Sequence, residues 1–145
     1  MIDFTIETRI ERAPREVFDF VTDPEQLPSW QTNTVSAEPE PAGPLALGSR
    51  IREVHKGPGG KDVESLVEVS EFEPGRLFAL KMVEGSLPVD ARIELEGAGS
   101  GTLMRFAVHG ELSGVMRLAQ PMLSLGLRRQ FEQHCANLKR VLEGG

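Results

Sequence analysis

The first residues of the chain alternate between apolar and polar side chains. Ile2, Phe4, Ile6 and Ile10 fall on one face of an extended chain, and acidic or other polar residues fall on the opposite face. A period of two is typical of a β-strand with one face in the core and the other in water. We therefore predict a strand over residues 2–11 that covers one side of the protein interior.

Two short helices are predicted immediately after this strand. Pro14 suits the first turn of a helix, where its missing N–H would be unpaired in any case. An apolar stripe of about two turns follows, and Pro24 ends the helix, because a residue that precedes proline disfavours the α-helical region. A second short turn, over residues 25–30, leads to Trp30, the only tryptophan. Two helices this short predict a connector rather than a helical layer.

The middle of the chain, residues 34–110, repeats the alternating pattern in several segments. Residues 89–96 show it most cleanly, with apolar side chains at every second position. Turns of a few residues, most of them containing glycine, separate the segments, and this spacing predicts an antiparallel meander. Residues 38–48 are rich in proline and glycine and predict a loop or an irregular sheet edge. The other predicted strands are 49–56, 63–73, 76–83, 89–97 and 102–112.

The end of the chain has a helical period instead. From about Ser113 the apolar residues advance by three or four positions, which predicts one long C-terminal helix. Pro121 and Gly126 lie in its first half, so we expect that half to bend or to start late. The second half, from Arg128, contains no helix breaker. A single helix cannot bury its apolar stripe alone, so it must lie across the sheet, and the predicted class is α+β.

Composition limits the class of protein. With 145 residues, 39% of them apolar and 26% charged, the chain is expected to form one soluble globular domain over residues 1–145. No apolar run approaches the roughly 20 residues of a membrane-spanning helix, and the N-terminus lacks the pattern of a secretory signal. The single cysteine, Cys135, excludes an internal disulfide and fits a reducing compartment. We therefore expect a cytoplasmic protein.

The net charge of −6 argues against nucleic acid as the main partner. The charge is uneven, however, because the residues from Ser113 onward carry five basic and two acidic side chains and are net positive. A basic amphipathic helix can lie on an anionic membrane as a peripheral contact. In the alternative interpretation the helix lies on the acidic sheet of its own chain, which then supplies the opposite charge.

Taken together, these segments resemble the START/Bet v 1-like (SRPBCC) superfamily, and specifically its polyketide cyclase/dehydrase-like group of small bacterial proteins. The resemblance covers essentially the whole chain and implies the helix-grip fold, a curved antiparallel sheet wrapped around a long C-terminal helix. The segments that carry it are IERAPREVFDFVTDPEQLPSW (10–30), LGSRIREV (47–54), VEVSEFEPGRLFAL (67–80), GTLMRFAVHGEL (101–112) and LRRQFEQHCANLKRVLE (127–143).

The resemblance implies a cavity between the sheet and the long helix. A cavity lined by Ile, Val, Leu, Met and Phe favours a small hydrophobic ligand, lipid-like or polyketide-like, held by a carrier or a sensor. Trp30 either plugs one end of the core or forms a wall of the ligand entrance. The expected ligand contacts are Trp30, Ile51, Val67, Phe78, Met82, Ile93, Met104, Phe106, Met116, Leu123, Leu127 and Phe131.

Two other functions stay open. The first is a polyketide cyclase or dehydratase, for which Glu53 and His55 are the acid–base candidates if their strand turns them inward together with Ile51. In the opposite register they are surface charges. The chain has no tyrosine and few inward polar residues, which weakens the enzyme interpretation. The second is a non-enzymatic interaction module that presents its basic helix.

The remaining candidates are interpreted as structural. His109, Arg92 and Arg105 alternate with apolar residues and are predicted to face solvent. Of the neighbours His134 and Cys135, only one can point directly inward, and we favour Cys135 as a small core residue. The methionines Met82, Met104, Met116 and Met122 are expected mainly to fill the core.

We expect no metal and no other cofactor. Three scattered histidines and one cysteine do not have the spacing of metal ligands. The motifs GxxxxGK[ST] and GxSxG are absent, and the glycine-rich stretches 57–60 and 97–101 lie in predicted hairpin turns without a following helix. A phosphate-binding loop is therefore not predicted.

Overall fold

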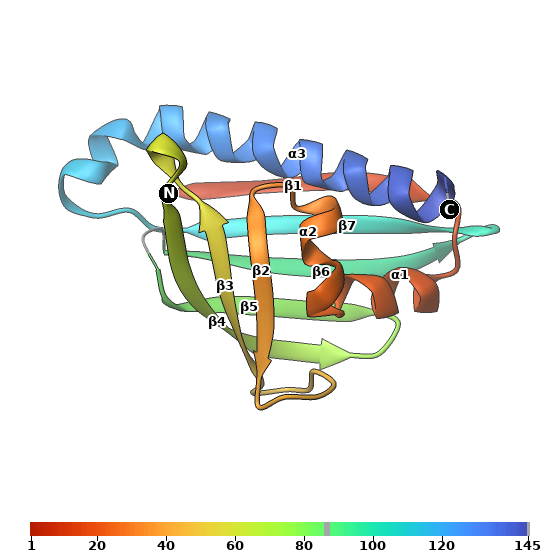
Figure 1. The fold of residues 1–145 in the computed structure, drawn as a ribbon. Coiled ribbons are helices and arrows are strands. Elements are labelled where there is room, and N and C mark those ends of the chain that lie inside the picture. The colour runs from red at the N-terminus through yellow and green to blue at the C-terminus, as the bar shows by residue number, and fades with distance from the viewer. Residues whose placement is uncertain (86–87, 145) are drawn as a thin grey trace.

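The computed structural model describes residues 1–85 and 88–144, which form a seven-stranded antiparallel sheet that faces one long helix (Figure 1). The strand order is β1-β7-β6-β5-β4-β3-β2, so the meander is continuous and β1 is added beside β7. The strands are β1 (Ile2–Ile10), β2 (Thr34–Glu40), β3 (Arg50–Lys56), β4 (Asp62–Glu73), β5 (Leu77–Glu84), β6 (Val89–Ala98) and β7 (Gly101–Gly110).

The helices form the cover of this sheet. Helix α3 crosses one face of the sheet, and the short helices α1 and α2 close one end (Figure 1). This arrangement is the helix-grip fold that the sequence predicts. The helices are α1 (Pro14–Val21), η1 (Pro24–Gln26), α2 (Leu27–Trp30), η2 (Pro58–Gly60), η3 (Gly114–Ala119) and α3 (Gln120–Gly144).

The sheet is strongly curved. In Figure 1, β1 and β7 run nearly along α3, whereas β2 and β3 cross it steeply. The register shifts within β4, once between Leu66 and Val67 and again between Val69 and Glu71. Such β-bulges bend a strand and increase its twist. The bulges therefore help the sheet to curl away from the straight helix.

Helix α3 is fixed along the edge strand β1. At one end the side-chain amide of Gln120 donates to the carbonyl of Met1 at 2.7 Å. At the other end Lys139 Nζ donates to the carbonyl of Arg9 at 2.6 Å, and Glu143 Oε2 accepts from the backbone N–H of Glu11 at 2.7 Å. Helix and strand thus run in the same direction, and they are joined over the whole length of the strand.

The corner after β1 forms as the sequence predicts. Pro14 begins α1, whose buried stripe is Val17, Phe18 and Val21. The Asp23 carboxylate accepts from the backbone N–H of Glu25 at 3.1 Å and caps the next turn.

The C-terminal helix starts late, as the prolines and glycines of the sequence indicate. A helix continuous from Ser113 would need an N–H at Pro121 to bond the carbonyl of Arg117, and proline has none. The segment Gly114–Ala119 is instead a 3₁₀ helix, and the α-helix begins at Gln120. Gly126 does not interrupt α3. The stretch 38–48 is divided, because residues 38–40 end the edge strand β2 and the rest is loop.

The second half of α3 supplies the tightest part of the core. Leu138 is fully buried and belongs to one cluster with Ile2, Ile10 and Val108 from the sheet. Leu118, which lies in the first half of the predicted helix, is instead 86% exposed.

This contrast predicts a large difference between two identical substitutions. Leu138→Ala should lower the free energy of unfolding by about 2–5 kcal/mol, because it removes buried methyl groups and leaves a cavity. Leu118→Ala should change it by no more than about 0.5 kcal/mol, because its side chain is already in water. Urea denaturation of both variants beside the unchanged protein measures the two values; similar losses would contradict the packing described here.

Candidate functional site

A cavity of about 280 Å³ lies between the curved sheet, the α1–α2 corner and α3. Its wall is mainly apolar and consists mostly of side chains from the five strands β3 to β7, from the α1–α2 corner and from α3. Six of the seven predicted contacts from the sheet line the cavity, and Met104 is the exception. The six are Ile51, Val67, Phe78, Met82, Ile93 and Phe106.

The helices close the cavity with three of the predicted residues. Trp30 from α2 and Leu127 and Phe131 from α3 line it. The Trp30 side chain is only 1% exposed, and its ring meets Phe106 in an edge-to-face arrangement with centroids 6.4 Å apart. Trp30 therefore both fills the end of the core and forms part of the cavity wall.

Three predicted contacts do not line the cavity. Met104 is fully buried and packs in the core, opposite Thr8 and Leu95 in the neighbouring strands. Leu123 is partly buried against the same core. Met116 is 38% exposed, because it lies in the 3₁₀ helix before α3, in which no residue is buried.

The methionines also divide differently from the prediction. Met104 fills the core, and Met82 lies on the cavity wall. Met122 is 80% exposed, and with Met116 it belongs to a segment that the sheet does not cover. The expectation that these two fill the core is therefore wrong.

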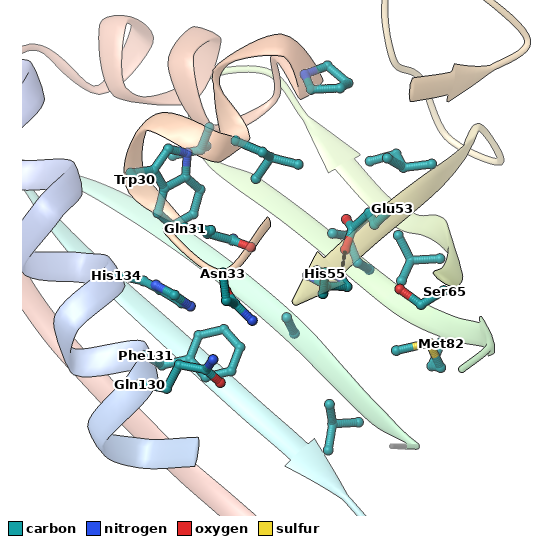
Figure 2. Close-up of a pocket in the computed structure, with 18 of the residues that line it drawn as sticks. Trp30, Gln31, Asn33, Glu53, His55, Ser65, Met82, Gln130, Phe131 and His134 are labelled. Carbon is teal, nitrogen blue, oxygen red and sulfur yellow. Dashed lines mark hydrogen bonds and ion pairs between the residues drawn. The ribbon is translucent and has the colours of Figure 1, made fainter. Parts of the chain in front are cut away.

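The strand β3 turns Glu53 and His55 into the cavity, in phase with Ile51. Both residues line it, and Glu53 is only 8% exposed. The carboxylate Oε1 of Glu53 lies 2.9 Å from Nε2 of His55. Figure 2 shows this pair on one side of the cavity and His134 and Phe131 of α3 on the other. The inward register, one of the two that the sequence leaves open, is the one observed.

The contacts of His55 continue to the α2 corner. Its Nδ1 lies 3.2 Å from the hydroxyl of Thr34, and that hydroxyl lies 3.5 Å from Oε1 of Gln31. With the ring proton on Nε2, His55 donates to the Glu53 carboxylate, and Nδ1 accepts from the Thr34 hydroxyl. Such a pair can hold a proton at the cavity wall and exchange it with a bound molecule.

His134 is a site residue that the sequence did not predict. It lines the cavity and is 3% exposed. Burial, assisted by the charge of His55, lowers its pKa from 6.5 to about 4, and the Trp30 carbonyl partly opposes the shift. At neutral pH His134 is therefore an uncharged hydrogen-bonding group. It is three positions after Phe131, which puts both on one helix face, and this spacing was the signal available.

His134 and Cys135 are both buried, although only one of them was expected to point directly inward. His134 faces the cavity, whereas Cys135 packs in the core, where the Thr8 hydroxyl of β1 reaches its sulfur. Burial raises the pKa of the Cys135 thiol to about 12, so it is unreactive. Both fit because α3 is covered on one flank by β1 and on the other by α2.

Several buried polar atoms on the cavity wall have no protein partner. Among the described residues, the buried side-chain atoms without a hydrogen bond are Trp30 Nε1, Asn33 Oδ1, Ser65 Oγ and His134 Nδ1. All four belong to residues that line the cavity. Because buried polar atoms are usually paired, a polar group that reached these atoms would gain hydrogen bonds. Ser65 lies opposite Glu53 across β3 and β4, a juxtaposition that depends on strand register.

The other polar candidates lie outside the cavity, as predicted. His109 and Arg92 are exposed, and Arg92 pairs with Glu71 and Glu94. Arg105 pairs with Glu7 and Glu96 on the outer sheet face. Within residues 1–85 and 88–144, no three His, Cys, Asp or Glu side chains are grouped as metal ligands, and no helix is long and apolar enough to cross a membrane.

The pKa of His134 predicts an acid-sensitive contribution to stability. The folded-state pKa lies below the unfolded one, so the unfolded chain takes up the proton first as the pH falls. Stability present above about pH 6.5 is therefore lost toward pH 4, by an amount of the order of 3 kcal/mol. In urea denaturation over this range, His134→Gln should lose less stability than the unchanged protein. His109→Gln, a control at an exposed histidine, should show the same pH dependence of stability as the unchanged protein. If all three proteins lost the same stability over this range, the low pKa of His134 would be contradicted.

Solved structures with the same fold share most of the chain length. Protein TTHA0849 from Thermus thermophilus has a TM-score of 0.81 at 19% identity, with 98% of this chain and 97% of that one covered. Protein NE0264 from Nitrosomonas europaea has a TM-score of 0.79 at 17% identity, covering 99% and 95%. Ara h 8.0201 has a TM-score of 0.73 at 15% identity, covering 99% and 98%. At these identities the likeness shows the fold.

The family follows from the sequence itself. No curated protein matches the chain. The model of one family, described as polyketide cyclase / dehydrase and lipid transport, matches residues 1–143. The chain therefore belongs to the polyketide cyclase / dehydrase and lipid transport family.

Proposed function

We propose that this protein binds a small, mainly apolar molecule in the cavity between the sheet and α3, as a carrier or a sensor. The observation that carries the proposal is the cavity of about 280 Å³ with its wall of Ile, Val, Leu and Phe side chains. Moving an apolar molecule from water to such a wall is favourable by about 25 cal/mol for each Å² buried. The family description, which includes lipid transport, supports the same function.

The polar groups of the wall favour a ligand that carries hydroxyl groups. With its ring proton directed at the Trp30 carbonyl, neutral His134 has a free lone pair on Nδ1 and accepts a hydrogen bond. Glu53, on the opposite side, is also an acceptor. A ligand carboxylate has no proton to donate to these acceptors. A neutral alcohol, enol or phenol with an apolar body fits this wall better than a fatty-acid anion.

Filling the cavity tests the binding function. Ala91 lines the cavity, whereas Ala107 is on the outer sheet face, where its strand neighbours are Thr5 and Arg92. Ala91→Trp should weaken binding of the neutral fluorescent probe Nile red at least about tenfold, because the indole occupies the space of the ligand. Ala107→Trp is the matched control and should bind like the unchanged protein.

Mass spectrometry of the purified, unchanged protein tests whether it carries a natural ligand. Mass spectrometry of an organic extract, beside a native spectrum of the intact protein, should find an apolar molecule in one-to-one ratio. An empty extract together with no Nile red binding by the unchanged protein would contradict the proposal, as would equal affinity in the two tryptophan variants.

Catalysis is a second candidate, and the inward Glu53–His55 pair is the observation that favours it. In ring closure of a poly-β-ketone, a base removes a proton from the carbon between two carbonyls. That carbon then attacks a distant ketone carbon, which closes the ring, and the ketone oxygen takes up a proton. Loss of the resulting hydroxyl and a neighbouring proton as water forms a double bond in the ring. Glu53 and His55, in contact at 2.9 Å, have the chemistry for the two proton transfers. The apolar wall would fold the chain into the reactive shape.

Two conservative variants separate catalysis from binding. If the pair transfers protons, Glu53→Gln and His55→Gln should each slow cyclisation of a poly-β-keto thioester by about 10²–10⁴-fold. Their affinity for Nile red should stay within about threefold, because the apolar wall is unchanged. The measurement is product formation by chromatography with mass detection. A rate in the unchanged protein equal to that in buffer removes the catalytic candidate and leaves the binding function intact.

A further inference from the structure

The segment formed by η3 and the first turns of α3, residues 114–129, exposes a cluster of large apolar side chains. Val115, Leu118 and Met122 are 83%, 86% and 80% exposed, and Leu125 is 51% exposed. A single exposed apolar residue is ordinary, whereas a contiguous group marks a contact surface. Figure 1 shows the segment as the light-blue coil that extends past the sheet at one end.

The segment has two different faces. Leu123, Leu127 and Phe131 follow one another by steps of four and pack toward the core or the cavity. Met122, Leu125 and Arg129 follow by steps of three and four, which places them together on another face of the helix. Met122, Leu125 and Arg129 are all exposed. The apolar residues of this exposed face, Met122 and Leu125, therefore take no part in packing the core.

The charge of the segment is entirely positive. Residues 112–131 contain Arg117, Arg128 and Arg129 but no aspartate or glutamate, in a chain of net charge −6. Arg128 is used internally, because its guanidinium lies 5.9 Å from the ring centre of Phe4 and 3.9 Å from Glu132. Arg117 and Arg129 are exposed, and among the described residues neither forms an ion pair. The acidic sheet therefore does not neutralise them.

The basic residues at the other end of α3 behave differently. Lys139 bonds to Glu143 at 2.8 Å and to the carbonyl of Arg9, and Arg140 donates to Asn137 at 3.0 Å. In the part of the chain that the structure describes, Arg140 forms no ion pair either, but no large apolar side chain is exposed beside it, so unpaired arginines and exposed apolar side chains occur together only at the start of the helix. Exposed aliphatic side chains flanked by arginines are the composition of a helix that lies in the interface of an anionic bilayer.

We propose that residues 114–129 dock onto an anionic lipid bilayer, with Leu118, Met122 and Leu125 inserted and Arg117 and Arg129 at the headgroups. A projecting, convex segment fits a deformable lipid surface. Leu127 in this segment and Phe131 in the following turn are on the cavity wall, so docking brings the cavity close to the membrane. The proposal does not depend on which ligand the cavity holds.

Vesicle flotation tests the proposal with the full chain. The protein should bind vesicles of phosphatidylcholine and phosphatidylglycerol, bind pure phosphatidylcholine far more weakly, and be released from the anionic vesicles by high salt. Leu118→Asp/Met122→Asp should lower the partition coefficient at least about tenfold through loss of inserted apolar surface. Arg117→Glu/Arg129→Glu should lower it by a similar factor through charge.

Matched controls carry the same chemical changes elsewhere. Leu47, 68% exposed in the loop after β2, and Arg15, exposed on α1, lie outside the segment. Leu47→Asp and Arg15→Glu should float like the unchanged protein. Circular dichroism and Nile red binding, each expected to be unchanged in all variants, separate loss of docking from loss of fold or of cavity.

Three outcomes would overturn the proposal. The first is no flotation of the unchanged protein on anionic vesicles. The second is equal flotation of the segment variants and the controls. The third is a stable dimer in sedimentation analysis that Leu118→Asp/Met122→Asp converts to a monomer, because the segment would then be the interface between two copies of the chain.

Discussion

A straight helix that lies in a curved sheet touches the sheet over only part of its length. Here α3 is joined to the edge strand β1 by hydrogen bonds near both ends, from Gln120 to Met1 and from Lys139 to Arg9. The sheet curls away from the helix toward β3 and β4, where the register shifts bend it. Side chains cannot fill the whole gap on that side, and the cavity is the result. Protein interiors are otherwise close-packed, so a space of this size is a feature of the fold itself.

The same constraint divides α3 into two halves with different roles. Toward its end the sheet and the α1–α2 corner both press on it, and Cys135 and Leu138 are buried. Toward its start the sheet supports only one face, so Leu127 and Phe131 face a cavity and Leu125 faces water. Binding and docking are therefore proposed for neighbouring turns of one helix, for a single geometric reason.

Burial of polar and charged side chains in the cavity lowers the stability of the fold unless they are paired or uncharged. A buried carboxylate is unfavourable unless it is paired, and His55 supplies that partner for Glu53 at 2.9 Å. His134 is instead held neutral, as the lowering of its pKa to about 4 indicates. The family covers both transport and cyclisation, and a shared fold does not choose between them. The choice depends on whether this pair only orients a ligand or also moves its protons.

The local sequence determined the elements of this protein, because their signals are local. Alternation predicted the strand at 89–97, observed as Val89–Ala98, and Pro14 and Pro24 set the limits of the first helix. Pro121 likewise predicted the late start of α3, since the missing N–H acts on its own turn. The resemblance of these ordered elements to a known superfamily then identified the helix grip.

Only the tertiary structure decided which face of each element meets the cavity. Glu53 and His55 enter it because β3 pairs with β4 in a register that sets Ile51 opposite Val67, and a strand pattern by itself allows either face. His134 was missed because β1 and α2 cover α3 from two sides, so more than one stripe is buried. Met116 was misplaced because the segment before Gln120 extends past the sheet, and none of its residues is buried. These features depend on contacts between distant residues, which a local period does not encode.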